Sequence, residues 1–490
     1  MSRSAVEELD KLTLDDTRDL SPRSPSPLKP TNPFLSVPPE LLSDILQHCK
    51  RPSYRAEKAE FARLSRVSKQ FFPIAQQLLY RSITIVIRPN GPNFIFESNE
   101  EVNTFLRDYQ LRRTLGSRTQ TGSLVQVLDI AFDEIPPSLD AGDVLGDLLA
   151  QVPKLQQLWL IDQGRGFWPV DRKDVEGSLR GTRTLIGTLT HFQARTLKTL
   201  VMPQIEVHPF VTHLVFATFS SLETFKGSVA ASTTSPNLPQ KVLSQLRRAY
   251  ITFFSNSQNV NFALSASTYS LRYLHLCFLK ENSPVELGRF LNLETLVITI
   301  KLITEPMLLS PGTNPSNAWQ EWINEAPNKL ISTALKTVES ARTIESLRHF
   351  SLLTNVHQFL PPHFEKFFLR FPPSIREFSL DSHACHSLPW SIFLLHHRQL
   401  YPHLEKFILR RPKDSKGDNA EDSKVYFEGI NDFQTRSGIE IEWIEDDNDK
   451  WGYFTEKLFC PWASEEELIG RENEFAKKQV QAENLSCVIS

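Results

Sequence analysis

A short apolar pattern recurs along most of the chain. It reads L-x-x-L-x-L with loose substitution by other apolar residues, and the alternation at its end is typical of a strand with two side chains facing inward. Copies that begin at residues 222, 246, 271 and 293 have a spacing common in stacked repeats. The copies begin at Val125, Leu155, Leu197, Leu246, Leu271, Leu293, Leu347, Ile375 and Leu404, with a partial copy at Leu222.

Stacking of these units is what the pattern predicts for residues 82–445. One unit cannot bury its own apolar face, so neighbouring units would share one core, with helices such as 331–344 on the outer side. We therefore expect an α/β strand-and-helix solenoid that begins with the strand SITIVI at 82–87. It would end at 439–443, where isoleucine and tryptophan alternate with glutamate as in a charged edge strand. Unrelated strands in another α/β fold are the alternative.

The stretch over 34–83 has helical periodicity instead. Pro38 stands at a helix-start position, where its missing N–H costs nothing, and rows of leucine and isoleucine one turn apart follow it. A second helix would carry Phe61 and Phe71 on one face, and Pro73 is expected to end it and start a third. Three short helices enclose little core, so this unit is either a cap on the solenoid or a binding surface for another protein.

The same stretch resembles an F-box. The matching positions are Val37-Pro38-x-Glu40-x-x-x-x-Ile45-Leu46, Leu64-Ser65-x-Val67-Ser68-Lys69-x-Phe71 and Ile74-Ala75-x-x-Leu78-Leu79-Tyr80-Arg81. The chain departs from the usual family pattern at Val37, Ser68 and Phe71, where Leu, Cys and Trp are more common. The repeats behind it are similar to leucine-rich repeats but lack the asparagine that usually follows the strand. Together they resemble fungal F-box proteins with a degenerate leucine-rich-repeat-like domain.

This resemblance implies a three-helix F-box over 34–81, followed by an irregular leucine-rich-repeat-like solenoid. It further implies the substrate-receptor subunit of an SCF-type ubiquitin ligase, which binds the Skp adaptor and through it cullin, and has no catalytic residue of its own. The residues that the resemblance assigns to the adaptor contact or its support are Val37, Pro38, Glu40, Ile45, Leu46, Val67, Lys69 and Phe71. Two alternatives to this ligase role remain open. The chain is either an F-box scaffold that recruits no cullin, or an enzyme with its site on the C-terminal part.

A target protein would bind on the strand face that points away from the core. The residue between the two apolar anchors of each strand faces that side, and aromatic residues there favour a protein-binding surface. The predicted target-binding residues are Trp159, Val201, Tyr250, His275 and Val297. The alternative is that loops or the terminal segment cover these side chains.

Composition narrows the partners. The 490 residues carry a formal net charge of −3 without a basic stripe, so we do not expect a nucleic-acid partner. Five scattered cysteines without paired spacing suit a reducing compartment, the cytoplasm or nucleus. We expect no secretory signal and no transmembrane helix, because the first residues lack an apolar region and no apolar run approaches the length of a membrane span.

Both ends of the chain look different from its middle. Residues 1–33 are rich in serine, proline and charge and are predicted to be disordered. Three serines there, Ser21, Ser24 and Ser26, precede proline and either take proline-directed phosphorylation or belong to a plain linker. Residues 446–490 are expected to cap the solenoid. Their end, Cys487-Val488-Ile489-Ser490, matches the C-a-a-X signal, so we expect farnesylation of Cys487 and weak, reversible membrane association.

Motifs for catalysis are missing from the sequence. It contains no glycine-rich phosphate loop and no G-x-S-x-G elbow. One cluster has the residue types of metal ligands: Asp381, His383, Cys385, His386, His396 and His397. Its spacing is not the paired spacing of a zinc site, so we expect neither a metal nor a cofactor.

Overall fold

A parallel sheet of twelve strands, joined in the order of the sequence, forms the body of the protein. This computed structural model describes residues 38, 41–42, 54–67, 71–87, 119–132, 146, 148–162, 187, 189–191, 193–202, 209–229, 241–254, 257–278, 283–300, 329–354, 366–380, 397–410 and 431–444. The strands are β1 (Ser82–Ile87), β2 (Val127–Phe132), β3 (Gln157–Asp162), β4 (Thr199–Val201), β5 (Thr224–Val229), β6 (Arg248–Phe254), β7 (Tyr273–Phe278), β8 (Thr295–Ile300), β9 (His349–Thr354), β10 (Glu377–Leu380), β11 (Lys406–Arg410) and β12 (Glu440–Ile444).

The register of the sheet aligns the repeated motifs. One column of paired residues runs through every strand and consists of Ile83, Leu128, Leu158, Leu200, Phe225, Ala249, Leu274, Leu296, Phe350, Phe378, Phe407 and Ile441. Each predicted copy of the motif therefore lies on a strand, and the α/β class is confirmed. The predicted first strand at 82–87 and the charged edge strand, predicted at 439–443 and observed at 440–444, stand at the two ends of the sheet.

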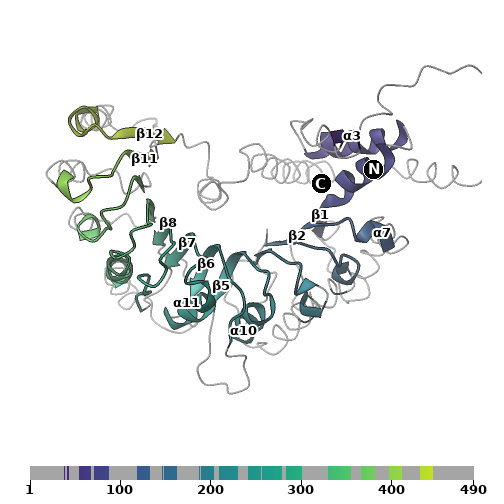
Figure 1. Ribbon diagram of the computed structural model, residues 1–490, viewed down its shortest axis with the longest axis horizontal. Coiled ribbons are helices and arrows are strands. Elements are labelled where there is room, and N and C mark those ends of the chain that lie inside the picture. Colours follow the sequence, from purple (N-terminus) through teal and green to yellow (C-terminus); the bar gives the residue numbers. More distant parts are fainter. Residues whose placement is uncertain are drawn as a thin grey trace, which may run out of the picture.

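The strands line the inner side of an arc, and the helices lie outside it (Figure 1). The outer elements include α7 (Thr119–Gly122), α10 (Pro209–Thr218) and α11 (Ser257–Ala263), with short 3-10 turns η2 (Ser265–Ser267) and η4 (Arg398–Leu400). The helix predicted over 331–344 is observed over 329–340. Its apolar residues recur at helical spacing, and Leu330, Ala334 and Val338 are all buried.

The described residues form two separate apolar cores. A continuous core follows the sheet from Ile83 to Ile439 and takes side chains from strands and outer segments alike. A second, smaller core consists of Leu42, Phe61, Ile74 and Leu78. The second core belongs to the N-terminal helices and is separate from that of the solenoid.

The N-terminal helices are α3 (Tyr54–Val67) and α4 (Phe71–Arg81). We expected Pro73 to end one helix and start the next, but α4 already begins at Phe71. Pro73 lies in the first turn of α4, where a backbone N–H has no intrahelical partner to lose. Of the predicted first helix, only residues 41–42 are described and helical. The structure thus shows two helices and part of a turn here, and not a complete three-helix unit.

A row of small polar side chains joins successive repeats at the turns before five of the strands, β5, β7, β8, β9 and β10. The hydroxyl of Ser270 donates to the backbone carbonyl of Leu246 at 2.8 Å. Four other repeats have a donor at the same position, and each donates to a backbone carbonyl of the preceding repeat. These hydrogen bonds are Ser221 to Arg195 O at 2.8 Å, Asn292 to Tyr269 O at 2.7 Å, Ser346 to Leu293 O at 2.8 Å and Ser374 to Leu347 O at 2.7 Å. These bonds provide partners for turn carbonyls that take no part in the hydrogen bonds between the parallel strands.

Candidate binding surfaces

The N-terminal helices leave part of their apolar surface uncovered. Leu42 and Phe61 fill the small core, whereas the neighbouring Leu41 and Phe72 are 54% and 43% exposed. The unit is also tied closely to the sheet, because α4 ends at Arg81 and β1 begins at Ser82. A small helical unit with exposed large apolar side chains and a short link to a larger body is suited to holding a partner protein in a defined place.

Three of the residues predicted to bind the adaptor lie in the described part of the chain. Pro38 is exposed, and its carbonyl accepts a hydrogen bond from Leu42 N at 3.1 Å, the four-residue spacing of an α-helical bond. Phe71, at the start of α4, packs half-buried against the small core, and Val67 ends α3. The others lie outside the described residues: Val37, Glu40, Ile45, Leu46 and Lys69.

Sequence reasoning placed Leu41 in an apolar row but did not single it out, and it passed over Phe72. The signal was available for Phe72, since two consecutive phenylalanines on one helix cannot both face the same small core. Adjacent helical positions are about 100° apart, so one ring turns inward and the other outward.

The inner row of the solenoid is largely covered. Among the predicted target-binding residues, Trp159 is half-buried, while Val201, Tyr250, His275 and Val297 are buried. The sequence left open whether these side chains are exposed for binding or covered by other parts of the chain, and the last four of them are covered. Their assignment to target binding stays a prediction.

Three residues of this row, together with Thr299, form a chain of polar and aromatic contacts across neighbouring strands. Lys226 on β5 places its Nζ 4.9 Å from the ring centre of Tyr250 on β6. That ring stacks on His275 of β7 with centroids 3.9 Å apart and an interplanar angle of 20°. His275 Nε2 then lies 2.7 Å from Thr299 Oγ1 on β8. Lys226 was missed because the repeat that contains it is only a partial copy of the motif.

Burial and the nearby charge of Lys226 disfavour the protonated form of His275. Its side chain has no exposed surface, and burial lowers the pKa of His275 well below the ordinary value, with the charge of Lys226 adding to the effect. Nε2 shares a hydrogen bond with Thr299, whereas Nδ1 makes none in the described part of the chain. A neutral imidazole stacked between strands serves the packing of the sheet and offers no accessible acid or base to a substrate.

Metal ligands are not gathered in the described residues: no group of three or more histidine, cysteine, aspartate or glutamate side chains there could hold an ion. Of the sequence cluster near residue 385, only His397 is described, and Asp381, His383, Cys385, His386 and His396 lie outside. Cys487 and the three serines at 21, 24 and 26 lie outside as well. Among the helices that are described, none is long and apolar enough to cross a membrane.

Comparison of the chain with protein-family models and with curated proteins finds no match in either set.

Proposed function

We propose that this chain is the substrate-receptor subunit of an SCF-type ubiquitin ligase. The observation that carries the proposal is the pair of exposed apolar side chains, Leu41 and Phe72, beside a small helical core within the stretch that resembles an F-box. Such a unit would dock on the Skp adaptor, and the leucine-rich-repeat-like solenoid behind it would hold the protein to be ubiquitinated. The scattered cysteines agree with the reducing compartments where such ligases work.

Action by positioning follows from this arrangement. A receptor that binds the adaptor at one end and a target at the other raises the effective concentration of the target near the charged ubiquitin. Transfer chemistry belongs to other subunits, so the receptor needs no catalytic residue of its own. The direct passage from Arg81 into β1 supports this role, because a rigid joint preserves the geometry between adaptor and target.

Adaptor capture by the full-length chain is the test. We expect the double change Leu41→Ala and Phe72→Ala to weaken capture of a purified Skp adaptor by tenfold or more, because two apolar contacts at about 1 kcal/mol or more each would be lost. Leu243→Ala with Leu369→Ala is the matched control, since these leucines are 41% and 47% exposed elsewhere on the chain. The control should bind like the wild type.

Two outcomes would change the proposal. If the wild-type chain does not capture the adaptor, or if the double change and Pro38→Ala with Ile45→Ala leave capture intact, the adaptor role is wrong. If the adaptor is captured but cullin never follows it, the chain is an F-box scaffold instead of a ligase receptor.

A further inference from the structure

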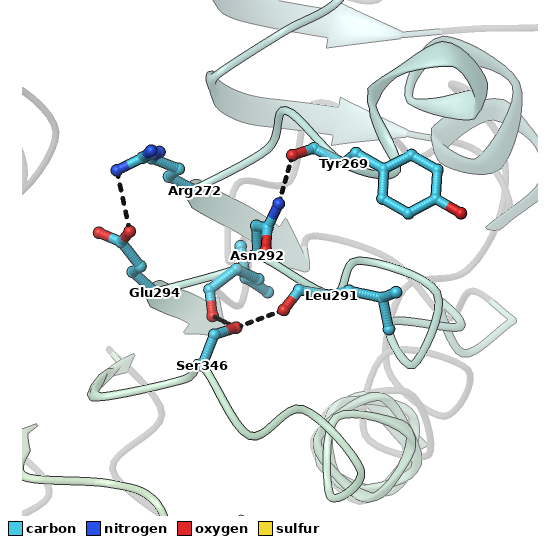
Figure 2. Close-up of polar contacts among 7 residues, drawn as sticks. Tyr269, Arg272, Leu291, Asn292, Glu294 and Ser346 are labelled. Carbon is cyan, nitrogen blue, oxygen red and sulfur yellow. Dashed lines mark hydrogen bonds and ion pairs between the residues drawn. The ribbon is translucent and has the colours of Figure 1, made fainter.

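The turns that precede β7 and β8 expose two large apolar side chains. Tyr269 is 73% exposed and Leu291 is 53% exposed, and they occupy the same position in neighbouring repeats, two residues before the first buried leucine. Figure 2 shows both side chains extending to the same side of the turns. Neither contributes to the core of the solenoid, so their burial would have to come from another molecule.

The backbone that carries this pair is held in place. Asn292 Nδ2 donates to the carbonyl of Tyr269 at 2.7 Å, and Ser346 Oγ donates to the carbonyl of Leu291 at 2.7 Å (Figure 2). Each turn is therefore fixed by the next repeat along the array. A partner that covers the pair would not have to order the loops first, which lowers the entropic cost of binding.

A row of arginines runs along the other side of the same turns. Arg247, Arg272, Arg348 and Arg376 each follow the first buried residue of their repeats and are exposed. In Figure 2 the pair Arg272–Glu294 lies across the turns from Tyr269. The same position of neighbouring repeats carries three acidic residues, Glu223, Glu294 and Glu405, and Glu294 is paired with Arg272 at 3.1 Å.

Two steps of this row bring like charges together. Arg272 N donates to Arg247 O at 2.9 Å and Arg376 N donates to Arg348 O at 2.7 Å, so the members of each pair are direct neighbours across the sheet. Like charges in such positions oppose each other unless an anion lies between them. Glu223 and Glu405 engage Arg247 and Arg376 from the far sides, at 3.7 Å each, whereas Arg348 has no ion pair in the described part of the chain.

We propose that this turn surface, defined by Tyr269, Leu291, Arg272 and Arg348, binds an extended segment of a partner protein. The segment crosses the turns, places a large apolar side chain against Tyr269 and Leu291, and places a carboxylate against Arg348 and its neighbour Arg376. Arg348, which stands beside Arg376 and has no ion pair in the described part of the chain, selects an acidic partner, and the exposed apolar pair selects a protein over a nucleic acid. This site is separate from the adaptor surface and does not depend on it.

A random twelve-residue peptide library displayed on phage and selected on the full-length chain provides the probe. We expect enriched peptides to combine a large apolar residue with aspartate or glutamate a few positions away. Measured singly by fluorescence anisotropy, they should bind at least tenfold more weakly to Tyr269→Ala with Leu291→Ala and to Arg348→Glu. Leu243→Ala with Leu369→Ala and the outer-helix change Lys336→Glu should bind like the wild type.

Several results would overturn this site. Peptides enriched without acidic residues, peptides that bind the variants unchanged, or a selection with no enrichment would each reject it. Loss of self-association on size-exclusion chromatography in the Tyr269→Ala with Leu291→Ala variant would assign the surface to a second copy of the chain. Binding of a single-stranded oligonucleotide that is lost in Arg348→Glu alone would assign it to nucleic acid. Adaptor capture should be normal in all these variants, so failure here is distinguishable from failure of the adaptor role.

Discussion

A single buried imidazole carries a consequence for stability that depends on pH. His275 stacks on Tyr250, bonds Thr299 and lies close to the charge of Lys226, so protonation would place a second positive charge in a buried position. Burial lowers the pKa of His275 in the folded chain, whereas the unfolded chain titrates near the ordinary value of 6.5. As pH falls below that value, the unfolded state binds a proton at His275 that the folded state does not bind, so the free energy of unfolding decreases.

We therefore expect the free energy of unfolding to fall between pH 7.5 and pH 5.5 with a contribution from His275 of up to about 1.4 kcal/mol per pH unit. The change His275→Phe keeps a ring on Tyr250 but cannot titrate, so it should flatten this dependence, as measured by urea unfolding at several pH values. His403→Gln, at an exposed histidine, should leave the slope unchanged. Equal slopes in the wild type and His275→Phe would show that the imidazole does not control acid stability.

At the scale of the element, the turns before the strands replace a feature that the sequence lacks. Leucine-rich repeats usually use an asparagine after the strand, and its absence left regularity open. In the structure, a serine or asparagine one residue before the first buried position of five repeats makes a hydrogen bond to the preceding repeat. The sequence shows these residues, but their acceptors lie 23 to 55 positions away along the chain. The register between repeats decides which carbonyl each one reaches, so the pairing could not be predicted from the sequence.

Removal of one of these bonds gives a direct measurement. Ser346→Ala deletes a hydroxyl shared by the carbonyls of Leu291 and Leu293, and we expect a loss of about 1 kcal/mol in the free energy of unfolding. Ser332→Ala, at an exposed site of the outer helix over 329–340, should change stability by only a few tenths of that, and urea unfolding compares the two. Equal effects would mean that the turn bonds are replaced by water without cost.

For the whole molecule, the order of the sheet predicts how damage spreads. Every strand pairs only with its neighbours in sequence, so each repeat is stabilised by the repeats on either side. Leu404 is buried in the shared core just before β11, near one end of the array. A cavity there should loosen nearby repeats more than distant ones.

Leu404→Ala should cost about 2–5 kcal/mol locally. Native-state hydrogen exchange should then rise in β10, β11 and β12 while β2, β3 and β4 keep their protection. Leu400→Ala, at a residue 37% exposed in the same region, is the control and should leave exchange nearly unchanged. A uniform rise over all strands would show instead that the array unfolds as one cooperative unit.

The sequence by itself determined the strands, their order and the side that each apolar residue faces. Alternation of period two identifies a strand wherever it lies, and recurrence of similar units implies that neighbours in sequence stack. It misjudged the start of α4, because Phe71 continues the apolar spacing of the preceding helix and gives no sign that a new helix begins there. Periodicity marks a face, but it does not mark where one helix stops and the next starts.

Only the tertiary structure decided what lies on each face. His275 and Trp159 occupy equivalent positions in their strands, yet one is fully buried and the other half-buried, and the alternation of period two is the same for both. Tyr269 and Leu291 sit in turns without any periodic signal, and their alignment exists only because β7 and β8 pair in register. Local pattern is a property of the chain, whereas exposure and partnership are properties of the packing between its parts.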